Sequence, residues 1–257
     1  VAPCPVLIVR KPAGDPYRQV LAAVDFSPVT ASVIAHALIL AGGAKVQTLH
    51  VLGSEVEQRL RRAKSDQVDV TGWLARLRSE AEGIDVKYHV LDAADEDALL
   101  SLGAGRFDRA VCTMALMDMP CLDPLMRSLT KLLKPQGCFV FSVIHPCFQA
   151  PAVQRFLEMS DEPSGRHEMR KGVRIWKYLR PEARKTEGII GQPQPQYYFH
   201  RPLQTILNAG FRAGFVVDAL EEPGFAPDTI EPEGLRWMDF SEIPPVMVVR
   251  MTIKAAG

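Results

Sequence analysis

The chain has 257 residues, 47% of them hydrophobic, which is enough for the core of one large α/β domain or of two small domains. Its 30 basic and 30 acidic residues cancel, so no overall field attracts nucleic acid or anionic membrane, and we expect neither as a partner. Five cysteines without a CxxC pair indicate a reducing, cytoplasmic location, and the sequence predicts no signal peptide, membrane span or metal site.

The N-terminal part of the chain alternates short apolar runs with helix-breaking residues. Three runs have the length of buried parallel strands, at residues 5–10, 20–24 and 45–52. After the second run, Ser27 and Pro28 provide an N-cap and a first-turn proline, and the glycine pair 42–43 ends the helix that they begin. Residues 54–83 have a charged, helical pattern.

This first part resembles a known family. The stretch CPVLIVRKPAGDPYRQVLAAVDFSPVT, followed by GAKVQTLHVL, is similar to a universal stress protein, a nucleotide-binding α/β family. The likeness is clearest over residues 4–52 and extends to about residue 80. It implies a site for ATP or AMP, in which Asp25 and the backbone near Val51 hold adenine and ribose. The phosphate-binding glycine loop of that family belongs after a fourth strand, where residues 113–120 contain no glycine.

Two acidic residues follow the next predicted strand. Residues 86–91 form an apolar run that ends at Asp92. Asp95 then precedes a short helix predicted at residues 96–102, where it has the position of an N-cap.

A strand, a helix and another strand are predicted in the middle of the chain. Residues 107–113 and 138–144 are apolar runs typical of buried parallel strands. Between them, Asp123 as N-cap and Pro124 as first helical residue begin a helix with one apolar face, and residues 134–137 end it. A strand, a crossover helix and a strand form a parallel, right-handed unit.

The C-terminal part is less regular. Residues 149–200 are polar and proline-rich, and we predict an irregular cap there. Its basic stretch, residues 165–188, is either a lid for an acidic substrate or a solvated face. A helix at 201–213, a strand at 215–220 and a last strand at 246–253 predict an antiparallel edge of the sheet.

The motifs of this second part carry another resemblance. FD-x-A-V-C-x-MALMDM, LL-KP-x-G and F-x-FSV-x-HPCF, in that order, resemble the second half of a class I S-adenosylmethionine-dependent methyltransferase, over about residues 85–257. The likeness implies a small-molecule substrate and an adenine site at Asp92 and Ala93. It also implies that four residues lie beneath the methionine end of the cofactor, namely Thr113, Met114, Ala115 and Leu116.

Each of these residues has a structural alternative. Asp92 could belong to the cap region of the following helix, and the methionine-rich run could be core. His145, at the mouth of the expected site, is a weak candidate for orienting the substrate or acting as a general base, and a hydrogen-bonded structural histidine is its alternative.

The glycine-rich loop of class I methyltransferases is missing after the strand at 20–24. The sequence there is Asp25-Phe26-Ser27-Pro28-Val29, without glycine, so Phe26 and Pro28 obstruct a close backbone approach. The carboxylate that should grip the ribose after the next strand is represented only by Glu55, several residues late. We therefore expect the affinity for S-adenosylmethionine to be weak or absent.

The whole pattern predicts one α/β domain of hybrid origin. A stress-protein-like segment (1–82) and a methyltransferase-like segment (83–257, with 149–200 as a cap) complete one three-layer, doubly wound, mostly parallel Rossmann-like sheet with an antiparallel edge. Residues 20–24 should lie centrally, beside 107–113. The predicted function is that of a methyltransferase-like chimera with impaired cofactor binding. The alternatives are a module that binds ATP or AMP and a non-catalytic scaffold, and a homodimer is left open.

Overall fold

A computed structural model describes residues 19–24, 45–51, 86–161, 167–186, 195–225 and 234–254. Its elements in chain order are β1 (Gln19–Val24), β2 (Lys45–Val51), β3 (Val86–Leu91), α4 (Glu96–Leu100), β4 (Phe107–Thr113), η1 (Leu116–Asp118), α5 (Asp123–Leu132), β5 (Leu133–Ile144), β6 (Gln154–Asp161), β7 (His167–Arg174), β8 (Glu182–Thr186), β9 (Gln196–His200), α6 (Leu203–Ala213), β10 (Phe215–Glu221), η3 (Trp237–Asp239) and β11 (Val246–Ile253). Within these ranges no helix is both long and apolar enough to cross a membrane.

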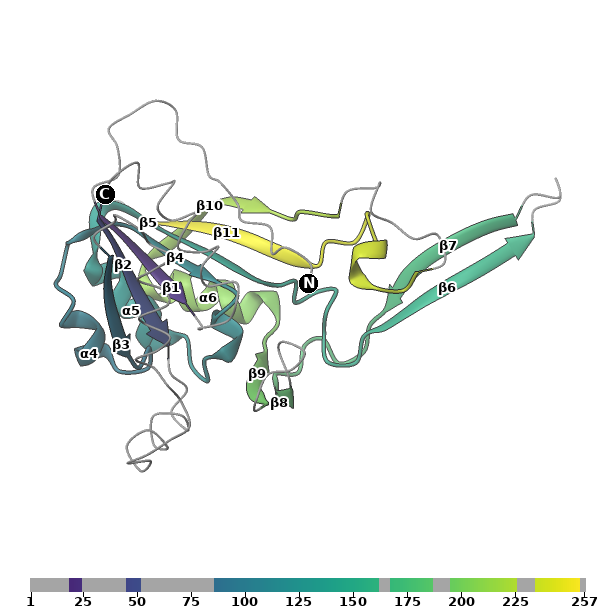
Figure 1. The fold of residues 1–257 in the computed structure, drawn as a ribbon, viewed down its shortest axis with the longest axis horizontal. Coiled ribbons are helices and arrows are strands. Elements are labelled where there is room, and N and C mark those ends of the chain that lie inside the picture. Colours follow the sequence, from purple (N-terminus) through teal and green to yellow (C-terminus); the bar gives the residue numbers. More distant parts are fainter. Residues whose placement is uncertain are drawn as a thin grey trace.

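Seven strands form one mixed sheet in the order β10-β11-β5-β4-β1-β2-β3 (Figure 1). The five strands β3, β2, β1, β4 and β5 are parallel to one another, whereas β11 is antiparallel to β5 and β10 is antiparallel to β11. β1 lies inside the sheet beside β4, with Leu21 opposite Ala110, as the two apolar runs predicted. The antiparallel C-terminal edge also agrees with the sequence.

The core lies between this sheet and a row of helices. Phe139 of β5 packs against Phe141 and Phe215, with ring centroids 5.4 Å and 6.3 Å apart. The apolar face of α5 buries Leu125, Met126, Leu129 and Leu132 against the same cluster. α5 contacts both α4 and α6, so these three helices form one layer. The helices predicted at 28–41 and 54–83, which would form the third layer, lie outside the described residues, and that layer stays a prediction.

Both ends of α5 differ from the sequence prediction. Leu122 is the N-cap, and Asp123 is already helical; its carboxylate accepts a 2.7 Å hydrogen bond from Arg212 of α6 instead of capping the helix. At the other end, β5 begins directly at Leu133 and includes the predicted connection 134–137. The register of its pairing with β4 shifts between Phe107 and Arg109, so residues 134–137 form a bulge rather than a loop.

The cap predicted as irregular contains two antiparallel hairpins, β6–β7 and β8–β9. The sequence missed them because most of the side chains described on these strands are partly or fully exposed, which leaves no alternation of buried and polar residues. Two basic residues of the cap pair with acidic neighbours on their own strand, Arg170 with Glu168 and Arg184 with Glu182. The β6–β7 hairpin projects away from the sheet (Figure 1).

Candidate functional site

The described residues among those predicted for the cofactor lie at or just after the carboxyl ends of β2, β3 and β4, on the edge of the sheet where doubly wound sheets bind their ligands. Val51 ends β2 opposite Leu91 of β3, so it lies next to the start of the turn that carries Asp92 and Ala93. Thr113 ends β4 opposite Ser142 of β5. Asp25 and Glu55, the other two predicted residues, lie outside the described residues.

Asp92 is held by the turn that it begins. Its Oδ1 accepts a 2.8 Å hydrogen bond from the backbone N–H of Ala94, and its carbonyl oxygen accepts one from Asp95 at 3.1 Å. Asp95 in turn accepts a 3.0 Å bond from Ala98, which confirms it as the N-cap of α4. Oδ2 of Asp92 accepts no hydrogen bond from the part of the chain that the structure describes. One carboxylate oxygen thus remains available to a donor such as an amino group.

The turn after β4 is conformationally unusual. Met114 has a left-handed backbone with φ 54°, which is uncommon for a residue other than glycine, and its N–H donates to the carbonyl of Ser142 at 3.0 Å. This bond fixes the turn to the end of β5. Ala115 and Leu116 are buried, whereas Thr113 and Met114 are half-buried. Only the latter two therefore keep side-chain surface for a ligand.

His145 is enclosed by partners. Its side chain is 3% exposed, its Nε2 lies 2.6 Å from Oε1 of Glu222, and its Nδ1 accepts a 3.2 Å hydrogen bond from the N–H of Cys147. With Nδ1 as acceptor, a neutral imidazole carries its proton on Nε2 and donates it to Glu222. The backbone N–H of His145 also donates to Pro245 at 2.9 Å. These contacts favour the structural alternative.

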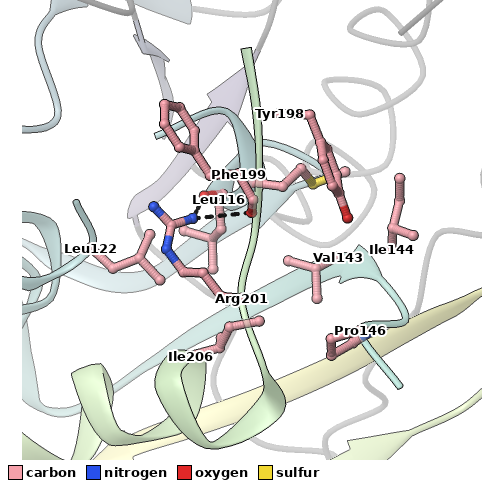
Figure 2. Close-up of a pocket in the computed structure, with 10 residues that line it drawn as sticks. Leu116, Leu122, Val143, Ile144, Pro146, Tyr198, Phe199, Arg201 and Ile206 are labelled. Carbon is pink, nitrogen blue, oxygen red and sulfur yellow. Dashed lines mark hydrogen bonds between the residues drawn. The ribbon is translucent and has the colours of Figure 1, made fainter. Parts of the chain in front are cut away.

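A hollow lies beside the turn after β4. Its cavity volume is only about 10 Å³, roughly the room of one water molecule, and the β4 turn, the end of β5, β9 and α6 with its flanks all line it (Figure 2). Its lining residues are Leu116, Met117, Leu122, Val143, Ile144, Pro146, Tyr198, Phe199, Arg201 and Ile206. Tyr198 and Phe199 belong to β9 of the cap. No sequence motif pointed to Arg201, and the pattern predicted it within a helix that in fact begins at Leu203.

Arg201 joins the cap to the turn after β4. Its Nη1 donates to the carbonyls of Leu116 and Phe199 at 3.3 and 3.5 Å, and its Nη2 donates to the carbonyl of Met119. Burial lowers the pKa of Arg201 from its ordinary value. Burial, reinforced by the charge of Asp118, raises the pKa of Tyr198. Arg201 nonetheless stays cationic, because a guanidinium does not lose its proton in proteins. The raised pKa keeps the Tyr198 hydroxyl protonated at neutral pH.

Comparisons with known proteins agree on the fold. The chain matches no protein-family model and no curated protein. Among solved structures, it is similar to an S-adenosylmethionine-dependent methyltransferase from Mesorhizobium loti, with 25% identity, a TM-score of 0.60, and coverage of 91% of this chain and 90% of that one. It is also similar to a proposed S-adenosylmethionine-dependent methyltransferase from Listeria monocytogenes, with 18% identity, a TM-score of 0.58, and coverage of 93% and 92%.

These likenesses define the class of fold: a Rossmann-like α/β fold shared with S-adenosylmethionine-dependent methyltransferases. The likeness to the Mesorhizobium loti protein supports a methyltransferase-like function. Because each covers at least nine-tenths of both chains, they lend no support to a separate stress-protein segment or to a hybrid origin.

Proposed function

We propose that the chain is an S-adenosylmethionine-dependent methyltransferase that acts on a small molecule. The observation that carries this proposal is the likeness to the Mesorhizobium loti methyltransferase over 91% of the chain. The strand ends support it, because the residues predicted for the cofactor lie together at the carboxyl edge of the sheet. Asp92 at this edge fits the adenine end of the cofactor, since its Oδ2 is available to an amino group, whereas Ala93 next to it is buried in the core.

Each end of this site has its own task in the proposed reaction. S-adenosylmethionine supplies an electrophilic methyl group on its sulfonium. Asp92 accepts a hydrogen bond from the adenine amino group. Thr113 and Met114 lie at the methionine end, and the rigid left-handed turn at Met114 holds that wall in place.

We expect this cofactor site to bind weakly. The segment 25–29 has no glycine and contains Pro28, which removes a backbone donor, and the ribose lacks a carboxylate directly after β2. A buried polar group left unpaired costs about 1–3 kcal/mol. Two such losses weaken binding by roughly two to four orders of magnitude, at about 1.4 kcal/mol per tenfold change.

Calorimetric titration of the purified chain with S-adenosylhomocysteine, and separately with ATP, tests the proposal. We expect S-adenosylhomocysteine to bind with a dissociation constant between roughly 100 μM and a few millimolar, the weak range that these losses imply. ATP, the ligand of the stress-protein alternative, should bind more weakly still. Binding of ATP alone would overturn the proposal in favour of a nucleotide-binding module. Low-micromolar binding of S-adenosylhomocysteine would keep the function and show that the missing glycine loop does not matter.

A further inference from the structure

The linker between the two hairpins of the cap, residues 175–181, exposes large apolar side chains. Leu179 is 69% exposed, Trp176 is 50% exposed and Ile175 is 37% exposed. No other five consecutive positions among the described residues carry three exposed large hydrophobic side chains. Single apolar residues are common on protein surfaces, whereas a group of them indicates a site of interaction.

Tyr178 fixes this linker to the body of the protein. Its hydroxyl accepts a 2.9 Å hydrogen bond from the N–H of Leu203, the first residue of α6, and lies 3.5 Å from Sγ of Cys147. Its carbonyl oxygen accepts a 2.8 Å hydrogen bond from Nε2 of His200. Because Tyr178 is tied through both its side chain and its backbone, the exposed side chains on either side of it are held at the surface. The linker is therefore a preformed surface, which reduces the entropy that a partner loses on binding.

The linker and its flanks are strongly basic. Residues 174–185 contain five basic residues and one acidic residue, a net charge of +4, although the net charge of the whole chain is zero. The acidic residue, Glu182, pairs with Arg184 at 2.6 Å. This hydrogen bond lowers the pKa of Glu182, and the charges of Lys177 and Arg180 lower it further, so both cations lie near the start of β8. Lys177 and Arg180 are exposed and form no ion pair with any residue that the structure describes, so the surface stays positive.

Exposed apolar side chains among positive charges suit the surface of an anionic lipid bilayer. Such a bilayer offers acyl chains to aliphatic side chains, an interface at which tryptophan is favoured, and negative headgroups that attract lysine and arginine. A single-stranded nucleic acid would also meet the cations and Trp176. Its bases stack on aromatic rings, however, and gain little from Leu179 and Ile175, which are aliphatic. The two aliphatic residues thus favour the lipid surface.

We propose that this linker docks the protein on an anionic phospholipid membrane, with Trp176 and Leu179 inserted at the level of the headgroups and Lys177 and Arg180 against the lipid phosphates. The attachment is peripheral, since only side chains of one linker enter the interface. It goes beyond the proposed function, because it requires neither the cofactor nor the methyl acceptor. The attraction comes from the local excess of positive charge and is therefore sensitive to salt.

Co-sedimentation of the full chain with unilamellar vesicles tests this docking. One set of vesicles is phosphatidylcholine alone, and the other contains about one-third phosphatidylglycerol, which makes the surface negative. We expect the partition coefficient to be about tenfold to a hundredfold higher on the anionic vesicles and to fall as salt is added. The double variant Trp176→Ser with Leu179→Ser should lower it at least about tenfold, because apolar surface is no longer removed from water. Lys177→Gln with Arg180→Gln should lower it about fivefold per charge.

Three further double variants are the controls. Met159→Ser with Met169→Ser removes two exposed apolar side chains from the β6–β7 hairpin, and Arg127→Gln with Arg212→Gln removes two exposed charges from the helix layer. Both should bind the anionic vesicles as the native chain does. Trp176→Phe with Leu179→Ile keeps the linker apolar and should bind within about threefold of the native chain. Urea unfolding checks that the linker variants, whose replaced side chains are exposed, keep the native stability.

Several results would overturn the inference. One is equal binding to the two kinds of vesicle, and another is an equal loss of binding in the linker and control variants. A third is no binding at about 1 mM lipid, where an anchor as weak as one myristoyl chain would be mostly bound. Binding to a single-stranded oligonucleotide but not to vesicles would assign the linker to nucleic acid. Dimerisation in analytical ultracentrifugation without vesicle binding, abolished by Trp176→Ser with Leu179→Ser, would assign it to a second copy of the chain.

Discussion

The environment of His145 decides between a structural and a catalytic role. Both ring nitrogens have partners and the side chain is 3% exposed, so removing it leaves a cavity and an unpaired N–H at Cys147. We expect His145→Ala to lower the free energy of unfolding in urea by about 2–4 kcal/mol. Glu222→Gln should cost less, because Glu222 is 48% exposed. A His145→Ala protein of unchanged stability that has lost methyl transfer would show instead that the residue is catalytic.

Asp92 and Asp95 are adjacent acidic residues with different predicted tasks. Asp92→Asn keeps an oxygen for the Ala94 N–H but places a donor where the adenine amino group needs an acceptor. We expect the affinity for S-adenosylhomocysteine, measured by calorimetry, to fall at least about tenfold with little change in stability. Asp95→Ala is the matched control. It removes the N-cap of α4, so stability should fall by about 1 kcal/mol at unchanged affinity. The opposite pattern would assign the adenine contact elsewhere.

The bulge between β4 and β5 depends on a glycine. A Cβ at Gly137 would lie 2.9 Å from the carbonyl oxygen of Lys134 and 3.2 Å from that of Asp108, and backbone atoms cannot easily give way. Gly137→Ala should therefore lower the free energy of unfolding by about 1–3 kcal/mol. At Gly172 of β7 the added Cβ would meet only the ring of Phe156, which can rotate away. Gly172→Ala should cost clearly less in the same urea titration, and equal costs would contradict this account of the bulge.

The burial of Cys138 in β5 should make the stability of the chain depend on pH. Burial raises the pKa of the Cys138 thiol above its ordinary value of 9.0, so the folded chain holds this proton at a pH where the unfolded chain releases it. The resulting stability is fully present below pH 9.0 and is lost as the pH rises from there towards the folded pKa. The difference in unfolding free energy between the native chain and Cys138→Ala should therefore shrink as the pH rises above 9.0. A constant difference would show that the thiol is not desolvated.

At the scale of the whole molecule, strands from both ends of the sequence share one sheet. β1 and β2 lie between β4 and β3, so a fragment of residues 83–257 would expose the edges of both β3 and β4. Unpaired strand edges promote aggregation. We expect this fragment not to fold cooperatively, as judged by circular dichroism and analytical ultracentrifugation against the full chain. A monomeric fragment with a sharp unfolding transition would favour two separate domains.

The sequence predicted the parts of the fold that have a local signal, such as an uninterrupted apolar run or a capping residue at the expected spacing. β3, β4, β10 and β11 are apolar runs that agree with the structure to within one residue, and the cap at Asp95 follows from local spacing. It could not predict the hairpins of the cap, because their exposed strands lack a hydrophobic period. It also could not place Arg201 in the hollow, because its contact with Leu116 joins residues 85 positions apart.

The central claim is that S-adenosylmethionine binds at the carboxyl edge of this sheet, and a ¹H–¹⁵N NMR titration of the full chain with S-adenosylhomocysteine tests it most directly. We expect saturable shifts of the amides of Ala93 and Met114, at the ends of β3 and β4, with none along the β6–β7 hairpin. Saturable shifts that leave Ala93 and Met114 unmoved, or no shifts at all up to the solubility limit of the ligand, would contradict it.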